Sequence, residues 1–157
     1  MVVIEMDNGR VIRIELDPKA APITAANFEK LVREGFYDGL TFHRVIRGFM
    51  IQGGDPKGNG TGGSKEKIRG EFAANGYNNP LRHTRGVISM ARAMDPNSAS
   101  SQFFIMHQDA PHLDGSYAAF GKVVEGMDAV DEIASVKTGF QDKPVEPVVM
   151  KRVYIED

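Results

Sequence analysis

The sequence contains no cysteine and no tryptophan among its 157 residues. Without cysteine the chain can form no disulfide framework, thiolate nucleophile, thiolate-bound metal site or redox dithiol. Long apolar runs are also missing, so no segment is predicted to span a membrane. A chain of this length buries about two-thirds of its unfolded surface, so it can fold without such supports. We expect one globular domain over residues 1–157.

Neither sign of charge is in excess. Lys and Arg number 19 and Asp and Glu number 21, which gives a formal net charge of −2. Nucleic-acid binders usually carry a basic excess or a basic stripe, so we expect no nucleic-acid partner. The first residues, MVVIEMDNGRVIRIEL, lack a basic leader followed by an apolar core. We therefore expect a cytoplasmic protein.

Alternating apolar residues predict a mostly β fold. Residues 2–6 and 11–16 alternate on either side of Asn8-Gly9, the strongest short signal for a hairpin. A helix is predicted from an N-cap at Thr24 to Gly35, and a second over 127–134. Eight short strands with two helices favour an antiparallel sheet closed on itself, because parallel folds need a helix after nearly every strand. The other β-like runs are 41–46, 49–52, 86–91, 102–106, 118–124 and 148–155.

The glycine-rich loop at 53–63 matches a nucleotide-binding motif only superficially. Gly58, Gly60 and Gly63 fit the pattern GxGxxG, but no apolar helix follows them. Ser64-Lys65 is also the reverse of the order that a P-loop requires. A flexible surface loop is the simpler interpretation.

The histidines show no motif for metal binding or hydrolysis. Four are present, namely His43, His83, His107 and His112, and none has the spacing of a zinc site. Ser101, His107 and Asp109 could be drawn as a catalytic triad. There is no GxSxG motif, however, and sequence order alone does not define a triad.

A cation stands among apolar residues in the segment 41–55. If 41–46 is a strand, Phe42, Arg44 and Ile46 share one face, and a cation there is costly unless it is paired or used. For this segment alone, an arginine that snorkels at the sheet edge is the simpler explanation. Met50 and Gln52 share a face of the next strand.

Two adjacent phenylalanines in the segment 98–106 point to opposite faces of a strand. One of them enters a core, and the other lies outward beside Gln102. An outward phenylalanine next to a glutamine indicates an apolar pocket with a polar rim. A strand covered on both faces is the alternative.

Together these segments resemble the cyclophilin family of peptidyl-prolyl cis–trans isomerases. The matching text is FHRVIRGFMIQGGD at 42–55, GNGTGG at 58–63, GVISMA at 86–91, SASSQFFI at 98–105 and HLDGSYAAFGKVVEGMDAVDEI at 112–133. The resemblance covers nearly the whole chain. It implies a closed eight-stranded antiparallel β-barrel capped by two α-helices, with a groove on its outside. It also implies isomerisation of Xaa-Pro bonds without cofactor or metal, in proline-containing peptides and in unfolded or flexible protein segments.

The resemblance also assigns residues to the site. Arg44, Phe49 and Gln52 match the catalytic positions, whereas His43 is expected to be structural. The substrate-binding positions are Met50, Gly60, Ala91, Arg92, Gln102, Phe104, His112, Leu113 and Tyr117. Of these, Met50, Phe104 and Leu113 would join Phe49 in the walls of a pocket for proline.

The physical demands of the reaction agree with this assignment. Amide resonance sets a barrier of about 18–20 kcal/mol to rotation. The barrier falls if the imide nitrogen becomes pyramidal and accepts a hydrogen bond. A guanidinium that stays charged at any working pH is a suitable donor. An apolar wall that grips the ring would favour the twisted bond over either planar isomer.

The sequence departs from the best-known family pattern at three positions. His112 replaces a tryptophan, Arg92 an asparagine and Tyr117 a histidine. In the family that tryptophan donates a hydrogen bond to cyclosporin, so we expect reduced cyclosporin affinity here. Arg92 adds a cation to the rim and predicts a preference for acidic flanking residues. A monomer is the expectation for the family.

Two other functions stay open at the level of sequence. One is a module that binds proline peptides but has lost catalysis, although such a module would not need Arg44. The other is a small hydrolase, which rests only on scattered Ser, His and Asp residues. A prolyl-peptide exchange assay and an esterase or peptidase screen separate these possibilities.

Overall fold

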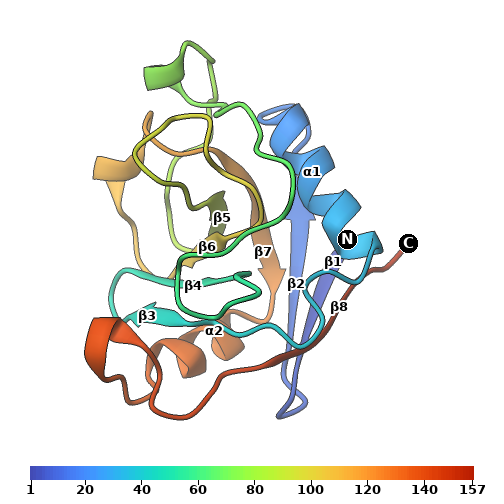
Figure 1. Cartoon of the computed structure of the whole chain (residues 1–157), viewed down its shortest axis with the longest axis vertical. Helices are drawn as coiled ribbons and strands as arrows, with labels where there is room; N and C mark the ends of the chain where they lie inside the picture. The colour runs from blue at the N-terminus through green and yellow to red at the C-terminus, as the bar shows by residue number, and fades with distance from the viewer.

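The computed structural model describes all 157 residues, which form an eight-stranded antiparallel sheet with two α-helices (Figure 1). The strands are β1 (Val2–Met6), β2 (Val11–Leu16), β3 (Arg44–Ile46), β4 (Met50–Gly53), β5 (Val87–Met90), β6 (Phe103–Met106), β7 (Ala119–Glu125) and β8 (Met150–Ile155). The helices are α1 (Pro22–Arg33) and α2 (Met127–Ala134), with 3₁₀ turns η1 (Ala73–Asn75), η2 (Pro111–Leu113) and η3 (Phe140–Asp142). No helix has both the length and the apolar character needed to cross a bilayer.

The sheet is open, which corrects the prediction of a closed barrel. Its strand order is β3-β4-β6-β5-β7-β2-β1-β8, so β3 and β8 are edges and form no ladder with each other. A single isolated bridge, between Thr41 and Val149, joins the segments that precede these two strands. Residues 41–43 leave the strand conformation, which shortens β3 to three residues. The result is a half-barrel of eight strands.

The N-terminal hairpin forms as predicted. Val2 pairs with Ile14 and Ile4 with Ile12 across the antiparallel strands β1 and β2. Gly9 has a φ of +88°, the left-handed conformation that favours glycine in this turn. Strand β1 also pairs with β8, so the two ends of the chain lie side by side (Figure 1).

Helix α1 begins differently from the prediction. Its N-cap is Ala21, which makes no side-chain cap, and Thr24 lies inside the helix. The free N–H groups of the first turn are bound instead by Glu71, a fully buried residue 47 positions away from Thr24. The Glu71 carboxylate accepts from the N–H of Ile23 at 3.2 Å and of Thr24 at 2.7 Å, and also from the Thr24 hydroxyl. The distant Glu71 carboxylate therefore caps the helix in place of the predicted local cap, Thr24. Helix α2 has the predicted bounds.

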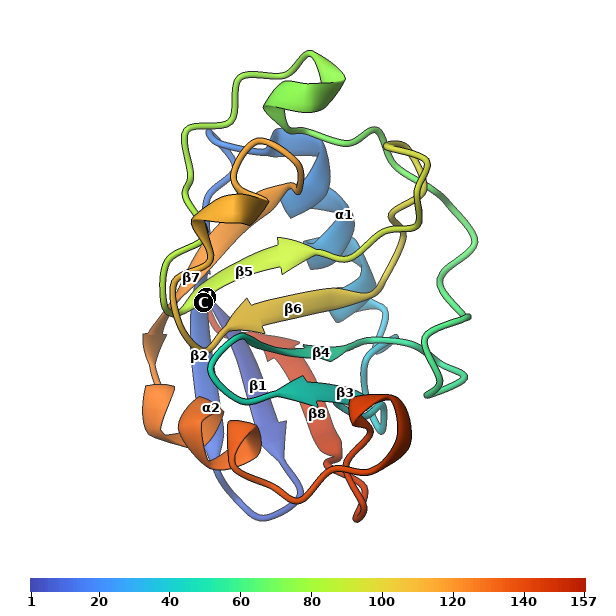
Figure 2. The same cartoon turned by 90° about the vertical axis from the view of Figure 1, so that its left-hand side faces the viewer.

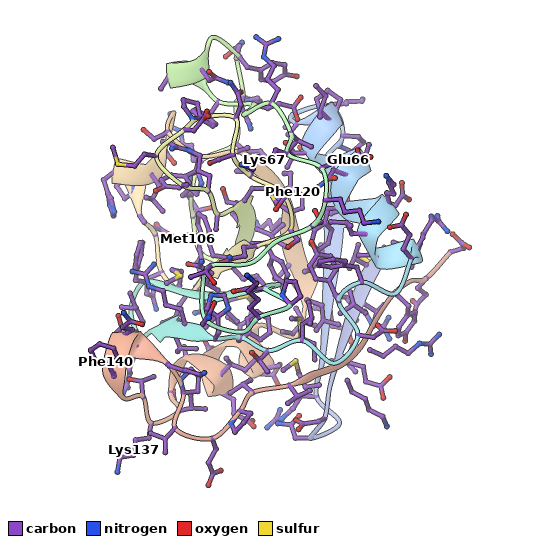
Figure 3. All side chains as sticks on the ribbon, in the orientation of Figure 1. Glu66, Lys67, Met106, Phe120, Lys137 and Phe140 are labelled. Atoms are coloured by element: carbon purple, nitrogen blue, oxygen red, sulfur yellow. The ribbon has the colours of Figure 1, made fainter.

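Most apolar side chains pack on the inner face of the sheet, in an inner cluster to which both helices contribute. In Figure 2, β5, β6, β4 and β3 lie side by side, with α1 behind them and α2 below. Phe103 makes edge-on contacts with Phe28, Tyr37 and Phe42, at centroid distances of 5.3, 5.4 and 5.9 Å. Phe120 is fully buried and lies inside the molecule (Figure 3).

A smaller outer cluster covers the opposite face of the sheet beneath η2. It contains Met50, Val87, Phe104, Met106, Ala110, Leu113 and Ala119. Adjacent Phe103 and Phe104 thus belong to different clusters, as their alternation predicted. Phe42 and Arg44 do not share a face, however, because the strand begins only at Arg44. Phe42 is buried in the inner cluster, and Arg44 is exposed.

Candidate active site

A pocket of about 140 Å³ opens on the outer face, and we refer to it as the central pocket. It is lined by Arg44, Phe49, Met50, Gln52, Ala91, Arg92, Phe104, Leu113 and Tyr117. All nine belong to the predicted site. They come from five separate segments of the chain, which the fold brings together. The cross-strand pairs of β4 set part of this arrangement, because Gln52 lies opposite Arg44 on β3 and Phe104 on β6.

A row of three polar side chains borders the central pocket. The Gln102 amide Nε2 donates to the carbonyl oxygen of Gly62 at 2.8 Å. Gln52 Nε2 donates to Gln102 Oε1 at 3.0 Å, and Arg44 Nη1 donates to Gln52 Oε1 at 3.3 Å. Since a carbonyl can only accept, Gly62 fixes which end of each amide faces its neighbour. Arg44 is therefore oriented by a carbonyl at the far end of the row.

Asp55 holds the glycine-rich loop in which Gly62 lies. Its buried carboxylate accepts from the backbone N–H of Lys57, Asn59 and Gly60, at 2.8, 3.2 and 2.6 Å. Burial alone raises the pKa of Asp55, but these hydrogen bonds and one from Gly62 outweigh it and lower the pKa. A Cβ on Gly62 would collide with the carboxylate, so the loop wraps closely around it. Sequence reasoning missed Asp55, although an Asp before a glycine-rich run is itself a turn signal.

His83 supports the apolar wall of the central pocket from behind. Its ring stacks on Phe104 at a centroid distance of 6.0 Å and an interplanar angle of 19°. Nδ1 lies 3.0 Å from the Asp114 carboxylate and Nε2 lies 2.8 Å from the Ser89 hydroxyl, so both ring nitrogens have partners. Burial lowers the pKa of His83 despite the neighbouring carboxylate. No sequence motif joins these residues, and sequence reasoning did not select His83 for the site.

A second pocket of about 340 Å³ adjoins the central pocket, and we refer to it as the loop pocket. It shares Gln52, Ala91 and Arg92 with the central pocket and adds the predicted residues Gly60 and Gln102. Its lining contains the cations Lys67 and Arg92 and no carboxylate. The loop pocket is therefore a polar hollow with a positive charge balance.

Arg92 is held firmly at the boundary between these pockets. Its guanidinium lies between the rings of Phe72 and Tyr117, 4.8 and 4.7 Å from their centroids. It also donates to backbone carbonyls, including that of Ser116 at 2.6 Å. Most of its N–H groups are thus already used, while its charge faces no carboxylate.

His112 lies beside the central pocket and outside its lining. Its ring packs against Phe49, with centroids 5.8 Å apart and an interplanar angle of 31°. His43 lies beneath the loop, where a Cβ on Gly60 would come within 3.8 Å of its Nε2. Neither ring nitrogen of His43 has a hydrogen-bond partner, and burial lowers its pKa.

A third hollow, of about 870 Å³, lies on the other side of Arg44 along the segment 139–145. At its edge, Phe140 is 87% exposed and points outward (Figure 3). His43, Gln52 and Gly60 also line it, so the polar row lies between two open regions.

The residues considered for hydrolysis have separate partners. Ser101 donates to the carbonyl of Gly54, His107 accepts from Gly48, and Asp109 accepts from the N–H of Arg85. They do not assemble into a triad. No cluster of three or more His, Asp or Glu side chains is arranged to hold a metal ion.

Comparison with known proteins gives a consistent result. The family model for the cyclophilin type peptidyl-prolyl cis-trans isomerase/CLD matches residues 1–155. Peptidyl-prolyl cis-trans isomerase B of Bacillus subtilis is 52% identical over 123 residues, which cover 78% of this chain and 82% of that protein. A peptidyl-prolyl cis-trans isomerase of Acinetobacter baylyi is 46% identical over 154 residues and covers 92% of this chain and 80% of its own.

Solved structures agree with these relatives. A cyclophilin type isomerase of Cryptosporidium parvum, crystallised in the presence of the dipeptide Ala-Pro, superposes with a TM-score of 0.90. It is 33% identical, and the match covers 99% of this chain and 98% of that one. A cyclophilin from Hirschia baltica gives a TM-score of 0.80 at 30% identity, covering 97% of this chain and 72% of that one.

Proposed function

This protein belongs to the cyclophilin-type peptidyl-prolyl cis–trans isomerases, and we propose that it catalyses rotation about Xaa-Pro bonds in the central pocket. The observation that supports this location is the meeting of an exposed guanidinium, that of Arg44, with an apolar pocket of about 140 Å³. The pocket is large enough for a small ring, and its walls Phe49, Met50 and Phe104 come from the β3–β4 turn, from β4 and from the neighbouring strand β6.

Arg44 is proposed to donate a hydrogen bond to the imide nitrogen of the substrate. Its hydrogen bond in the structure goes to the neutral Gln52 at a long 3.3 Å, and no carboxylate neutralises it. The guanidinium therefore keeps donors that can turn to a substrate. The nitrogen accepts a hydrogen bond only when rotation has broken the amide resonance. Such a bond stabilises the transition state more than either planar isomer.

The apolar walls are proposed to hold the proline ring while the rest of the peptide bond turns. Phe104 and Leu113 are buried in the outer cluster, so they form a wall with little freedom to move. Gln52 and Gln102, held by Gly62, would fix the peptide backbone beside Ala91. The proposed mechanism needs no cofactor and forms no covalent bond with the substrate.

The proposed substrates are proline-containing peptides and unfolded or flexible protein segments. The central pocket is open on the surface and adjoins the loop pocket, so an extended chain can pass across both. Catalysis on such segments would assist protein folding, because uncatalysed prolyl isomerisation takes tens to hundreds of seconds.

Cyclosporin is proposed to bind with reduced affinity. His112 packs against Phe49 at the position where the family often has tryptophan. We expect His112→Trp to tighten cyclosporin binding, measured by titration calorimetry, with little change in isomerase activity. Binding by the unaltered protein as tight as by His112→Trp would contradict this role.

The test of the mechanism compares Arg44→Ala with Arg47→Ala. Arg47 lies in the exposed turn of the same hairpin and does not line the central pocket. Loss of a transition-state donor typically costs about 100-fold or more in rate, and we expect that loss for Arg44→Ala alone. The assay is exchange NMR on a series of Xaa-Pro peptides. Near-normal catalysis by Arg44→Ala contradicts the mechanism, and peptide binding without catalysis by the unaltered protein favours a binding module.

A further inference from the structure

His107 contacts the turn that carries Phe49 through two separate groups. It directly follows β6, and its ring Nδ1 accepts the backbone N–H of Gly48 at 2.8 Å. Its own backbone N–H donates to the carbonyl of Phe49 at 2.9 Å. His107 lies outside the predicted site, yet its hydrogen bonds to Gly48 and Phe49 flank the peptide bond that joins these two residues.

The geometry defines the tautomer of the His107 ring. The Gly48 N–H can only donate, so Nδ1 carries no proton and Nε2 carries it. Nε2 lies 3.2 Å from the Asp131 carboxylate on α2. The proton on Nε2 therefore faces an acceptor, and both ring nitrogens have a partner.

Arg85 fixes the carboxylate that faces His107. Its Nη1 and Nη2 each lie 2.7 Å from one oxygen of Asp131, a two-pronged pairing. Nη1 also donates to the carbonyl of His107 at 2.9 Å. Arg85 lowers the pKa of Asp131, so the carboxylate stays ionised. The ring orientation of His107 is thus determined by Asp131 on helix α2 and by Arg85, which lies two residues before β5.

Apart from His107, few groups support the turn: the Gln108 N–H makes a long contact of 3.4 Å to the Phe49 carbonyl, and the Phe49 ring packs against His112. It joins β3, the edge strand of three residues, to β4, and Gly48 occupies a left-handed conformation with a φ of +79°. Within the turn, the Phe49 N–H donates to the carbonyl of Ile46 at 3.0 Å. Phe49 then presents its ring to the central pocket.

We propose that His107 is a positioning residue for isomerisation, which holds the Gly48–Phe49 turn through Nδ1 and so sets the place of the Phe49 wall against Arg44. The proposal rests on the proposed function of the central pocket. Gly48 is exposed, so water can take over its N–H if the ring is lost. Water satisfies the donor but cannot hold the turn in place. The proposal therefore predicts a loss of activity with little loss of stability.

Two substitutions separate the two ring contacts. In His107→Asn, Oδ1 occupies the position of Nδ1 along the side chain and can accept from Gly48, but no group reaches Asp131. In His107→Gln, the terminal amide occupies the position of Nε2 and can donate to Asp131, but no acceptor faces Gly48. Both remove the imidazole, so a general effect of losing the ring is common to both.

The expected result is a difference between these variants in the exchange assay. His107→Gln should lower kcat/KM by about five- to tenfold, because small displacements of positioning groups are costly to rate. His107→Asn should stay within about twofold of the unaltered protein by the same argument. The thermal midpoints of the two variants should differ little. The amide proton shift of Gly48 should be retained in His107→Asn and should move in His107→Gln.

Either of two results overturns the proposal. One is full activity of His107→Gln, and the other is an equal loss in both variants at matched stability. If one variant does not fold, Asp131→Ala is measured instead, because it leaves no acceptor for Nε2 of His107. An unchanged Gly48 shift together with full activity in Asp131→Ala counts against the proposal. Arg44→Ala in the same assay tests the proposed function separately, and the Gly48 shift reports on the contact whatever that result.

Discussion

Phe103 and Phe104 are neighbours in sequence, yet they belong to two different environments. Phe103 lies on the inner face among Phe28, Tyr37 and Phe42, where its contacts are with other rings. Phe104 lies on the outer face, where it packs on His83 and Tyr117 and borders the central pocket. The same strand β6 therefore supplies a core on one side and a site on the other.

The difference lies in how each face satisfies its polar groups. The inner cluster is stabilised mainly by burial of apolar surface, and its one hydroxyl, that of Tyr37, donates to the carbonyl of Ser101. The outer face combines apolar walls with Arg44, Gln52 and Gln102, whose amides are aligned by the Gly62 carbonyl. A half-buried polar row of this kind works only if each member has its partner. The inner face thus determines stability, and the outer face can determine chemistry.

The largest expected effect separates these two faces directly. Phe103→Ala should lower the free energy of unfolding by about 3–5 kcal/mol, because it opens a cavity in a closely packed ring cluster. Phe104→Ala should cost about 1–2 kcal/mol less than that, since its site adjoins an open pocket that solvent can enter. Urea unfolding measures both.

For isomerase activity, Phe104→Ala should be the more damaging of the two substitutions. Phe104→Ala removes a pocket wall and should lower kcat/KM by about tenfold or more. Folded Phe103→Ala should retain most activity when assayed well below its unfolding midpoint. Equal losses of activity in both variants would remove the distinction between the faces.

Sequence alone could predict that Phe103 and Phe104 lie on different faces, but not the long-range contacts that build each face. Alternation places Phe103 and Phe104 on opposite faces because the period of a strand is local. It misplaced Phe42 because the strand begins only at Arg44, and it missed the open edge between β3 and β8 because that edge depends on pairing far along the chain. The assignment of Arg44 to catalysis came from the family resemblance and is still a prediction.

Other parts of the site lie beyond any local pattern. Glu71 binds the first turn of α1 from 47 residues away, and Asp114 binds His83 from 31 residues away. A single sequence carries no periodic signal for contacts of this separation. The fold must bring the residues together before their roles become visible.

A smaller effect is expected where the polar row meets its loop. Asp55→Asn should lower the free energy of unfolding by about 2 kcal/mol, because a charged acceptor of several N–H groups is replaced by a neutral one that also presents an NH₂. Activity should fall too, because Gly62 would no longer be held. Asp95→Asn is the matched control, since the Asp95 carboxylate accepts one backbone N–H, that of Asn97, in an exposed turn. Equal effects of the two substitutions would exclude Asp55 as the anchor of the loop.

Two buried histidines should also make stability depend on pH. Burial lowers the pKa of both His43 and His83 below the ordinary value of 6.5. As the pH falls below about 6.5, the unfolded chain binds protons before the folded one does, so the free energy of unfolding decreases. The stabilisation is fully present above that pH. The measurement is urea unfolding at about pH 8 and about pH 5, roughly 1.5 units on either side of the ordinary histidine pKa. The free energy of unfolding should decrease less between these two pH values in His43→Leu than in the unaltered protein. An identical decline would show that His43 does not titrate on unfolding.

The smallest expected effect concerns substrate charge at the edge of the site. Arg92 is fixed between Phe72 and Tyr117 and donates to carbonyls, so it acts on a substrate as a charge and not as a two-pronged ligand. Arg92→Gln should reduce the preference for Glu over Gln next to Xaa-Pro by about two- to threefold, the size expected for an exposed charge pair.

Arg152→Gln is the control, because Arg152 also lies over a ring, that of Tyr154, but on β8. A preference that is unchanged in Arg92→Gln, or equally changed in both variants, would assign the charge selectivity to the net field of the protein. A preference lost only in Arg92→Gln, and weakened by added salt, would place it at the outer face.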